Sequence, residues 1–134
     1  MALVALVGRL LLAMIFLLSG LHKIPAFASV AEDMANHRVP FPEVALIATI
    51  LIEVVGGIAL AIGYRTRVVA AVIAAWLVVV TIVYHTSLVV AQTQDQTIQF
   101  LKNLAILGGL LGLVGNGPGS LSLDARPRRN RIVV

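Results

Sequence analysis

The sequence predicts an all-α integral membrane protein, in which four antiparallel helices span the bilayer as a bundle and a short amphipathic helix joins the first two. Its 134 residues are 60% apolar and only 12% charged, whereas an ordinary soluble domain has about 45–50% and about 25%. A soluble domain of this size could not bury so much apolar surface. The apolar residues gather in four runs, each near the roughly 20 residues that a helix needs to cross a bilayer core.

The four apolar runs are expected to be helices, because a segment inside lipid must satisfy its own backbone hydrogen bonds. The expected spans are residues 2–22, 44–63, 68–90 and 98–115. Short connections between spans favour antiparallel neighbours. Residues 1–125 therefore form one predicted domain, and residues 126–134 form a basic tail.

The longest connection, residues 22–43, contains Pro25, Pro40 and Pro42, which prevent a continuous helix. Between these prolines, apolar residues recur at helical spacing, while acidic and amide residues take the other positions. This pattern predicts a short amphipathic helix on the membrane surface, and a plain loop is the alternative. The apolar residues are Ile24, Phe27, Val30, Ala31 and Met34.

The distribution of Lys and Arg predicts the orientation of the spans. An even number of spans puts both termini and the turn at residues 63–67 on one side of the membrane. Because cytoplasmic loops are enriched in Lys and Arg, the richer side is expected to be the cytoplasmic one, with both termini there. That side carries Arg65, Arg67, Arg126, Arg128, Arg129 and Arg131, and the other side carries Lys23, Arg38 and Lys102.

Composition also excludes several classes of function. The chain has no cysteine, so it offers no disulfide, thiolate nucleophile or Cys-ligated metal site. Its three histidines are scattered without metal-ligand spacing, and no metal site is expected. The net charge of +4 owes much to a tail without interleaved aromatic residues, so nucleic-acid binding is not expected.

Four ionisable residues lie within predicted spans, where each costs about 2.5–3.5 kcal/mol and marks a candidate functional site. They are Arg9, Glu53, His85 and Lys102. Glu53 lies at the middle of its span and needs either a proton or a cationic partner. Arg9 is the expected partner, because both residues lie roughly 10–14 Å from the cytoplasmic face. Such a pair could hold two helices together or bind a ligand, and the sequence does not distinguish these two roles.

Helical angles of about 100° per residue place each of these charges on a face of small residues. Small residues let membrane helices approach closely, so these faces are expected to point into the bundle. The faces of the first two spans hold Arg9, Ala13, Phe16, Gly20 and Lys23, and then Leu46, Thr49, Glu53, Gly57 and Leu60. Those of the last two hold Arg67, Ala71, Ala74, Val78, Thr81 and His85, and then Lys102, Ala105, Gly109, Gly112 and Asn116. The glycines expected to pack helices are Gly20, Gly56, Gly57, Gly108, Gly109 and Gly112.

A polar group is also expected near the outer ends of the spans. His85 and Lys102 would lie there with His22 and Lys23, and Asn103 follows Lys102 in sequence. Such a group suits an anionic or carbonyl headgroup, and anchoring at the membrane interface is the alternative. The ligand-binding candidates are Arg9, Lys23, Glu53, His85, Lys102 and Asn103; no residue is assigned a catalytic role.

Several short motifs occur in an order and spacing that match a known family. They are residues 8–10, 16–23, 39–42, 53–57, 63–67, 117–119 and 122–124, and the most specific is the segment at 102–111, KNLAILGGLL. On these motifs the chain resembles the DoxX family of small four-helix bacterial membrane proteins over nearly its whole length. The family often has a glycine just before the Pro-x-Pro step, where this chain has Asn36-His37-Arg38. The shape of the outer loop therefore does not follow from the resemblance.

The resemblance implies a multi-pass protein of the bacterial inner membrane. The family is similar to the small subunit of an archaeal thiosulfate:quinone oxidoreductase, which implies a redox-associated protein that binds a quinone or a lipid-like ligand in a polar cavity of the bundle. Because the chain has no flavin, haem or cysteine motif, a membrane or soluble partner protein would supply the redox centre. The chain is then an accessory subunit rather than a self-sufficient enzyme, with no intrinsic cofactor and a quinone as its ligand.

Two other functions stay open at this point. One is a structural or assembly subunit of a membrane complex, in which the buried charges hold helices together. The other is a small transporter or proton conduit, for which four helices are few unless the protein forms homo-oligomers. Membrane lipids are expected partners under every one of these functions.

Overall fold

The computed structural model describes residues 1–85 and 94–126. Within them it contains five helices and no strand, which confirms the all-α prediction and the short helix between the first two spans. Four of the helices are long and apolar enough to cross a membrane. The expected extension of the third span to residue 90 lies outside the described residues. The helices are α1 (Ala2–Lys23), α2 (Phe27–Asn36), α3 (Pro42–Ile62), α4 (Thr66–His85) and α5 (Gln94–Asn116).

Proline and glycine mark the two ends of α3. Pro42 is its first residue, where the missing N–H of proline leaves no hydrogen bond unmade. Gly63 ends the helix in the left-handed conformation, with φ at 72°, which glycine adopts without strain. A side chain at Gly63 would also run into Ser122 and would lie 3.1 Å from Arg9 Nη1. The turn into α4 is therefore packed tightly against the segment that follows α5.

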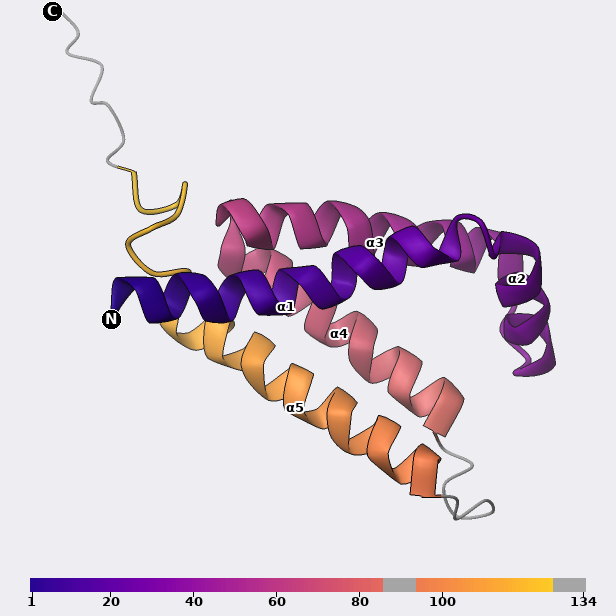
Figure 1. Cartoon of the computed structure of the whole chain (residues 1–134). Helices are drawn as coiled ribbons and strands as arrows, with labels where there is room; N and C mark the ends of the chain where they lie inside the picture. The colour runs from indigo at the N-terminus through magenta and orange to yellow at the C-terminus, as the bar shows by residue number, and fades with distance from the viewer. Residues whose placement is uncertain (86–93, 127–134) are drawn as a thin grey trace, which may run out of the picture.

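The spans form two pairs that meet at one end of the molecule and diverge toward the other (Figure 1). Helix α1 lies along α3, and α4 lies along α5. The pairs meet at the end that holds the N-terminus, the turn from α3 to α4 and the end of α5, which we call the tail end. At the opposite end, which we call the α2 end, α2 lies across the ends of α1 and α3, and the first half of α5 lies away from α1.

Two clusters of buried apolar side chains form the core. The larger one fills the space where the two pairs meet and includes Phe16, Leu60, Ile73 and Leu110. The smaller one joins α2 to α3 through Ala31, Met34 and Leu46. Outside these clusters most large apolar side chains of the spans are exposed, as expected of surfaces that contact lipid acyl chains.

The inward faces of α1 and α3 hold the predicted residues, whereas the predictions for α4 and α5 are met only in part, by Ala74 and Gly109. In α4 the buried face includes Thr66, Ala70, Ile73, Ala74 and Leu77, while Arg67, Ala71 and Val78 are exposed. In α5 the residues that pack on the core are Ile106, Leu107, Leu110, Leu113 and Val114, while Lys102, Ala105, Gly112 and Asn116 are exposed. Larger apolar side chains of α4 and α5, such as Ile73 and Leu110, fill the core where the two pairs meet. Most of the described residues predicted for the inward faces of α4 and α5 are therefore exposed.

Candidate functional site

Toward the α2 end, three polar side chains form a largely buried cluster between α1 and α3, made of Ser19, Lys23 and Glu53. Lys23 Nζ lies 2.7 Å from Glu53 Oε2 and 2.6 Å from Ser19 Oγ. Ser19 Oγ in turn donates to Glu53 Oε1 over 3.3 Å. The Lys23 side chain is 22% exposed and that of Glu53 is 11% exposed. The three side chains thus form a closed ring, which satisfies a charge pair away from water.

Local sequence explains how the ring forms. Ser19 and Lys23 are four residues apart, so they lie on one face of α1. Lys23 is the last residue of α1, and its side chain turns back along the helix toward Ser19 instead of outward to the membrane interface. Glu53 lies near the middle of α3, so the ring holds the positive charge of Lys23, from the end of α1, inside the membrane span.

Glycines bring the two backbones close enough for this ring. A Cβ at Gly20 would lie 2.7 Å from Val54 Cγ2 and 3.0 Å from Glu53 Cβ, and one at Gly57 would lie 2.8 Å from Leu17 Cγ. Neither position has room for a methyl group, so α1 and α3 pack directly through them. Gly56 is close to Ile73 of α4 and Gly109 of α5 is close to Leu12 of α1. By contrast, a Cβ at Gly108 or Gly112 would meet no described atom within 4 Å, so these two do not lie at helix contacts.

The predicted ion pair between Arg9 and Glu53 is wrong, because Lys23 takes that place. Arg9 instead donates to three backbone carbonyls, those of Pro118 at 2.6 Å, Leu121 at 2.7 Å and Ala61 at 3.3 Å. It is only 2% exposed. Depth in the membrane did not identify these partners, because backbone carbonyls can also hold a guanidinium and because Lys23 points inward along α1. The i, i+4 spacing of Ser19 and Lys23 was the available signal for the pair that forms.

A second polar contact at the tail end was missed by the sequence reasoning. The Asp124 carboxylate accepts hydrogen bonds from the backbone N–H groups of Arg65 at 2.7 Å and Thr66 at 2.8 Å. It therefore caps the start of α4. Burial raises the pKa of Asp124, but the hydrogen bonds from Thr66 and Arg65 and the positive charge of Arg9 outweigh it, and the pKa lies below its usual range. A capping residue that lies 58 positions after the first residue of its helix leaves no local signal in the sequence.

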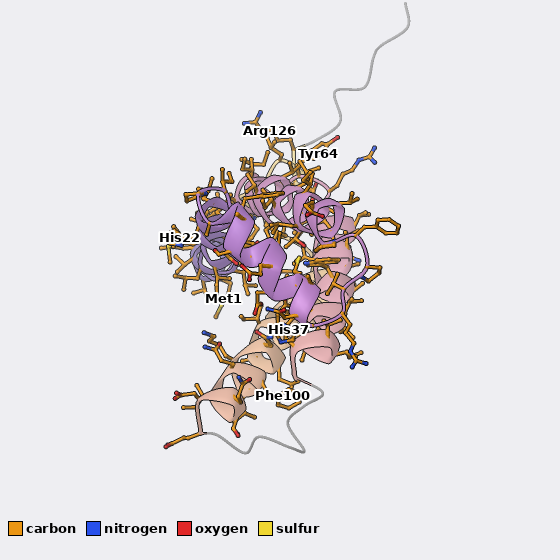
Figure 2. The ribbon with its side chains drawn as sticks, turned by 90° about the vertical axis from the view of Figure 1, so that its right-hand side faces the viewer. Met1, His22, His37, Tyr64, Phe100 and Arg126 are labelled. Carbon is orange, nitrogen blue, oxygen red and sulfur yellow. The ribbon has the colours of Figure 1, made fainter. Side chains whose placement is uncertain are left out.

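The expected outer group does not form among the described side chains. Lys102 is exposed on α5, and this half of α5 lies away from α1 (Figure 1). Figure 2 shows His22 on the outside of α1, well apart from Phe100, which is two residues before Lys102. Asn103 is half-buried and donates to Thr81 Oγ1 over 3.1 Å, which links α5 to α4. The side chain of His85 lies outside what the structure describes.

The geometry thus does not bring the six candidates together, and the side chain of one of them, His85, is not described. Lys23 and Glu53 form one buried acid–base pair, and Arg9 is held by carbonyls. Asn103 joins two helices, and Lys102 is exposed. Within the described residues no group of His, Asp and Glu could hold a metal ion.

Comparison with known proteins places the chain in a family. The DoxX family profile matches residues 4–86. The Escherichia coli (strain K12) inner membrane protein YqjF is 33% identical over 119 residues, which cover 89% of this chain and 88% of that protein. Inner membrane protein YphA of the same organism is 29% identical over 123 residues, which cover 90% of this chain and 88% of that protein. No solved structure matches significantly. With four apolar helices and inner-membrane relatives, this multi-pass inner-membrane protein belongs to the DoxX family.

Proposed function

We propose that the protein is a redox-associated membrane subunit that binds a quinone or lipid-like ligand at the Lys23–Glu53 pair. A partner protein supplies the redox centre. The observation that supports this proposal is the short contact between Lys23 and Glu53, both largely buried at the α2 end. Ionisable residues inside a membrane are costly and mark functional sites by default.

One of the three donors of Lys23 makes only a weak contact and could turn to a ligand. An ammonium group has three N–H donors, and two of them make the short contacts with Ser19 Oγ and Glu53 Oε2. The third is 3.4 Å from the backbone oxygen of Ser19, beyond the ordinary range of an N–H···O bond. That oxygen also accepts the backbone hydrogen bond of α1. A ligand carbonyl would therefore compete with the weakest of the three contacts.

The pair also suits proton exchange with such a ligand. A quinone takes up protons when it is reduced, and an acid–base pair beside its carbonyl can deliver them. The electrons come from the partner, because the chain has no cysteine and no flavin or haem motif.

A second donor lies at a similar depth. Gly56 of α3 packs against Ile73 of α4, and since these helices are antiparallel, Trp76 lies near the level of Glu53. The Trp76 Nε1 atom is buried and has no hydrogen-bond partner among the described residues. A buried N–H without a partner is costly, so a ligand oxygen would find a second donor at this depth.

The test is to release the protein gently from its own membrane, record its native mass spectrum and identify what organic solvent extracts from it. We expect a stoichiometric quinone or isoprenoid that is lost in Glu53→Gln and Lys23→Gln. The controls Glu43→Gln and Lys102→Gln alter exposed residues and should retain it. Equal ligand content in all five proteins would overturn the proposed site. An empty protein that retains a second polypeptide would instead support an assembly subunit.

We also propose that both termini lie in the cytoplasm, on the basis of the arginines near the tail end. The chain has no cysteine, so single cysteines can be introduced without background. A cysteine at Ser120 should resist a membrane-impermeant maleimide in intact spheroplasts, and one at Ser29 should react. The reverse labelling would invert the topology.

A further inference from the structure

A polar pocket and an apolar groove meet on the outer surface of α4 at the tail end, and neither belongs to the Lys23–Glu53 site. The polar pocket is an open hollow of about 790 Å³ between the start of α4 and the segment after α5. The apolar groove, of about 410 Å³, runs between α3 and α4. Val68 lines both, so the two form one continuous surface.

The polar pocket carries positive charge. Arg65 and Arg67 line it, together with Asn116 and Ser120. The Arg65 guanidinium lies 5.9 Å from the centre of the Tyr64 ring, and that of Arg67 lies beside Gly117. Arginine forks match the geometry of phosphate oxygens.

Asp124, the one acidic residue among the described lining of this pocket, does not neutralise the positive charge of the two arginines. Asp124 is among the lining residues, but its two carboxylate oxygens accept the backbone N–H groups of Arg65 and Thr66. The negative charge is therefore directed at the backbone of the turn. The two guanidinium groups at the pocket remain available to an anion.

The apolar groove continues from the pocket into the membrane. Its walls are the branched side chains of Val55, Val68, Val72 and Ile73, and Gly56 lies among them. Its lining is almost wholly apolar and belongs to two spans. A ligand that fills both parts needs an anionic group at the membrane interface and a hydrocarbon chain that enters the bilayer beside it.

We propose that this surface binds an anionic phospholipid, with its phosphate headgroup at Arg65 and Arg67 and one acyl chain in the groove between α3 and α4. The continuity through Val68 favours a lipid over free phosphate, which has no chain to place. It also favours an anionic lipid over a zwitterionic one, because two arginines flank the headgroup position.

The test uses native mass spectrometry with an equimolar mixture of phosphatidylglycerol and phosphatidylcholine that carry the same acyl chains. Each arginine near a membrane surface favours an anionic lipid about fivefold, so with two arginines the wild type should retain phosphatidylglycerol roughly 25-fold better than phosphatidylcholine. Arg65→Gln with Arg67→Gln should bring the two lipids to near-equal retention. Arg38→Gln, at the α2 end, should leave the preference intact.

The groove is tested separately by filling it. Val72→Trp should reduce retention of both lipids several-fold, whereas Val79→Trp should not, because Val79 is equally exposed on α4 but does not line the groove. Circular dichroism and gel filtration confirm that each variant folds. An unchanged lipid preference in the double arginine variant would overturn the proposal. The proposal would also be overturned if millimolar inorganic phosphate displaced the lipid and Val72→Trp had no effect on lipid retention. The site would then be one for free phosphate.

Discussion

The two ends of the bundle hold a buried positive charge in different ways. At the tail end, three backbone carbonyls surround the Arg9 guanidinium. At the α2 end, the Lys23 ammonium is held by the side chains of Ser19 and Glu53. Backbone carbonyls cannot take up or release a proton, whereas Lys and Glu can. A charged residue inside the membrane therefore does not by itself indicate a functional site. A charge held by backbone carbonyls is expected to be structural, whereas a charge paired with a titratable side chain is a candidate for ligand binding and proton transfer.

Removal of the tail-end charge should have the largest effect on stability. Arg9→Leu removes two short charge-assisted hydrogen bonds and leaves buried carbonyls without a donor, at a cost of about 3 kcal/mol or more. Unfolding by dodecyl sulfate in mixed micelles measures this free energy. Lys102→Leu removes an exposed charge and serves as the control. Similar unfolding midpoints for the two variants would contradict a structural role for Arg9.

The next largest effect is expected where the backbones are closest at the α2 end. Gly20→Ala puts a methyl group within 2.7 Å of Val54 Cγ2, so α1 must move away from α3, which costs about 1–3 kcal/mol. Gly108→Ala meets no described atom within 4 Å and should be neutral or slightly stabilising, since alanine favours helix. The same unfolding assay compares them. Equal losses in both would mean that the α1–α3 contact does not depend on Gly20.

The Lys23–Glu53 pair should contribute less than Arg9, although it is also buried. In Glu53→Gln the lysine, at the end of α1, can turn outward and reach the interface. A double-mutant cycle with Lys23→Met should give a coupling energy of about 1 kcal/mol, in the range of polar pairs within membranes. If the coupling energy were instead about 3 kcal/mol, as large as the loss expected for Arg9→Leu, the two buried charges would contribute equally to stability and the two ends would not differ in this respect.

The smallest effect is expected from the cap at Asp124, and it depends on pH. The folded pKa of Asp124 lies below its usual range, so the stabilisation is present above the unfolded pKa of about 3.9 and is lost as pH falls through the folded value. Asp124→Asn should cost about 0.5–1 kcal/mol near neutral pH. The difference from the wild type should shrink below about pH 4. A difference that stays constant from neutral pH to pH 2.5 would rule out this ionised cap.

The sequence predicted the part of the fold that depends on local composition. Apolar run length gave the four spans, and the small-residue faces of α1 and α3 were correct because Gly20 and Gly57 permit direct backbone contact. The faces of α4 and α5 were right only at Ala74 and Gly109, because the pairs diverge, which no periodicity reveals. Lys23 and Glu53 were both named as candidates, but their pairing depends on a lysine that turns back toward Ser19. The roles of Pro118, Leu121 and Asp124 could not be predicted, because backbone carbonyls and distant caps leave no pattern of residue types.

The carbonyls of Pro118 and Leu121 are separated from Arg9 by 109 and 112 residues. The ribosome makes α1 first, so this helix enters the membrane long before its partners exist. In the interval the guanidinium lacks its two shortest contacts, and its long side chain lets it reach water and lipid phosphates at the interface. The folding back of the segment after α5 is thus the step that completes the bundle. A chain stalled before Pro118 would hold α1 in a shallower position than the finished protein does.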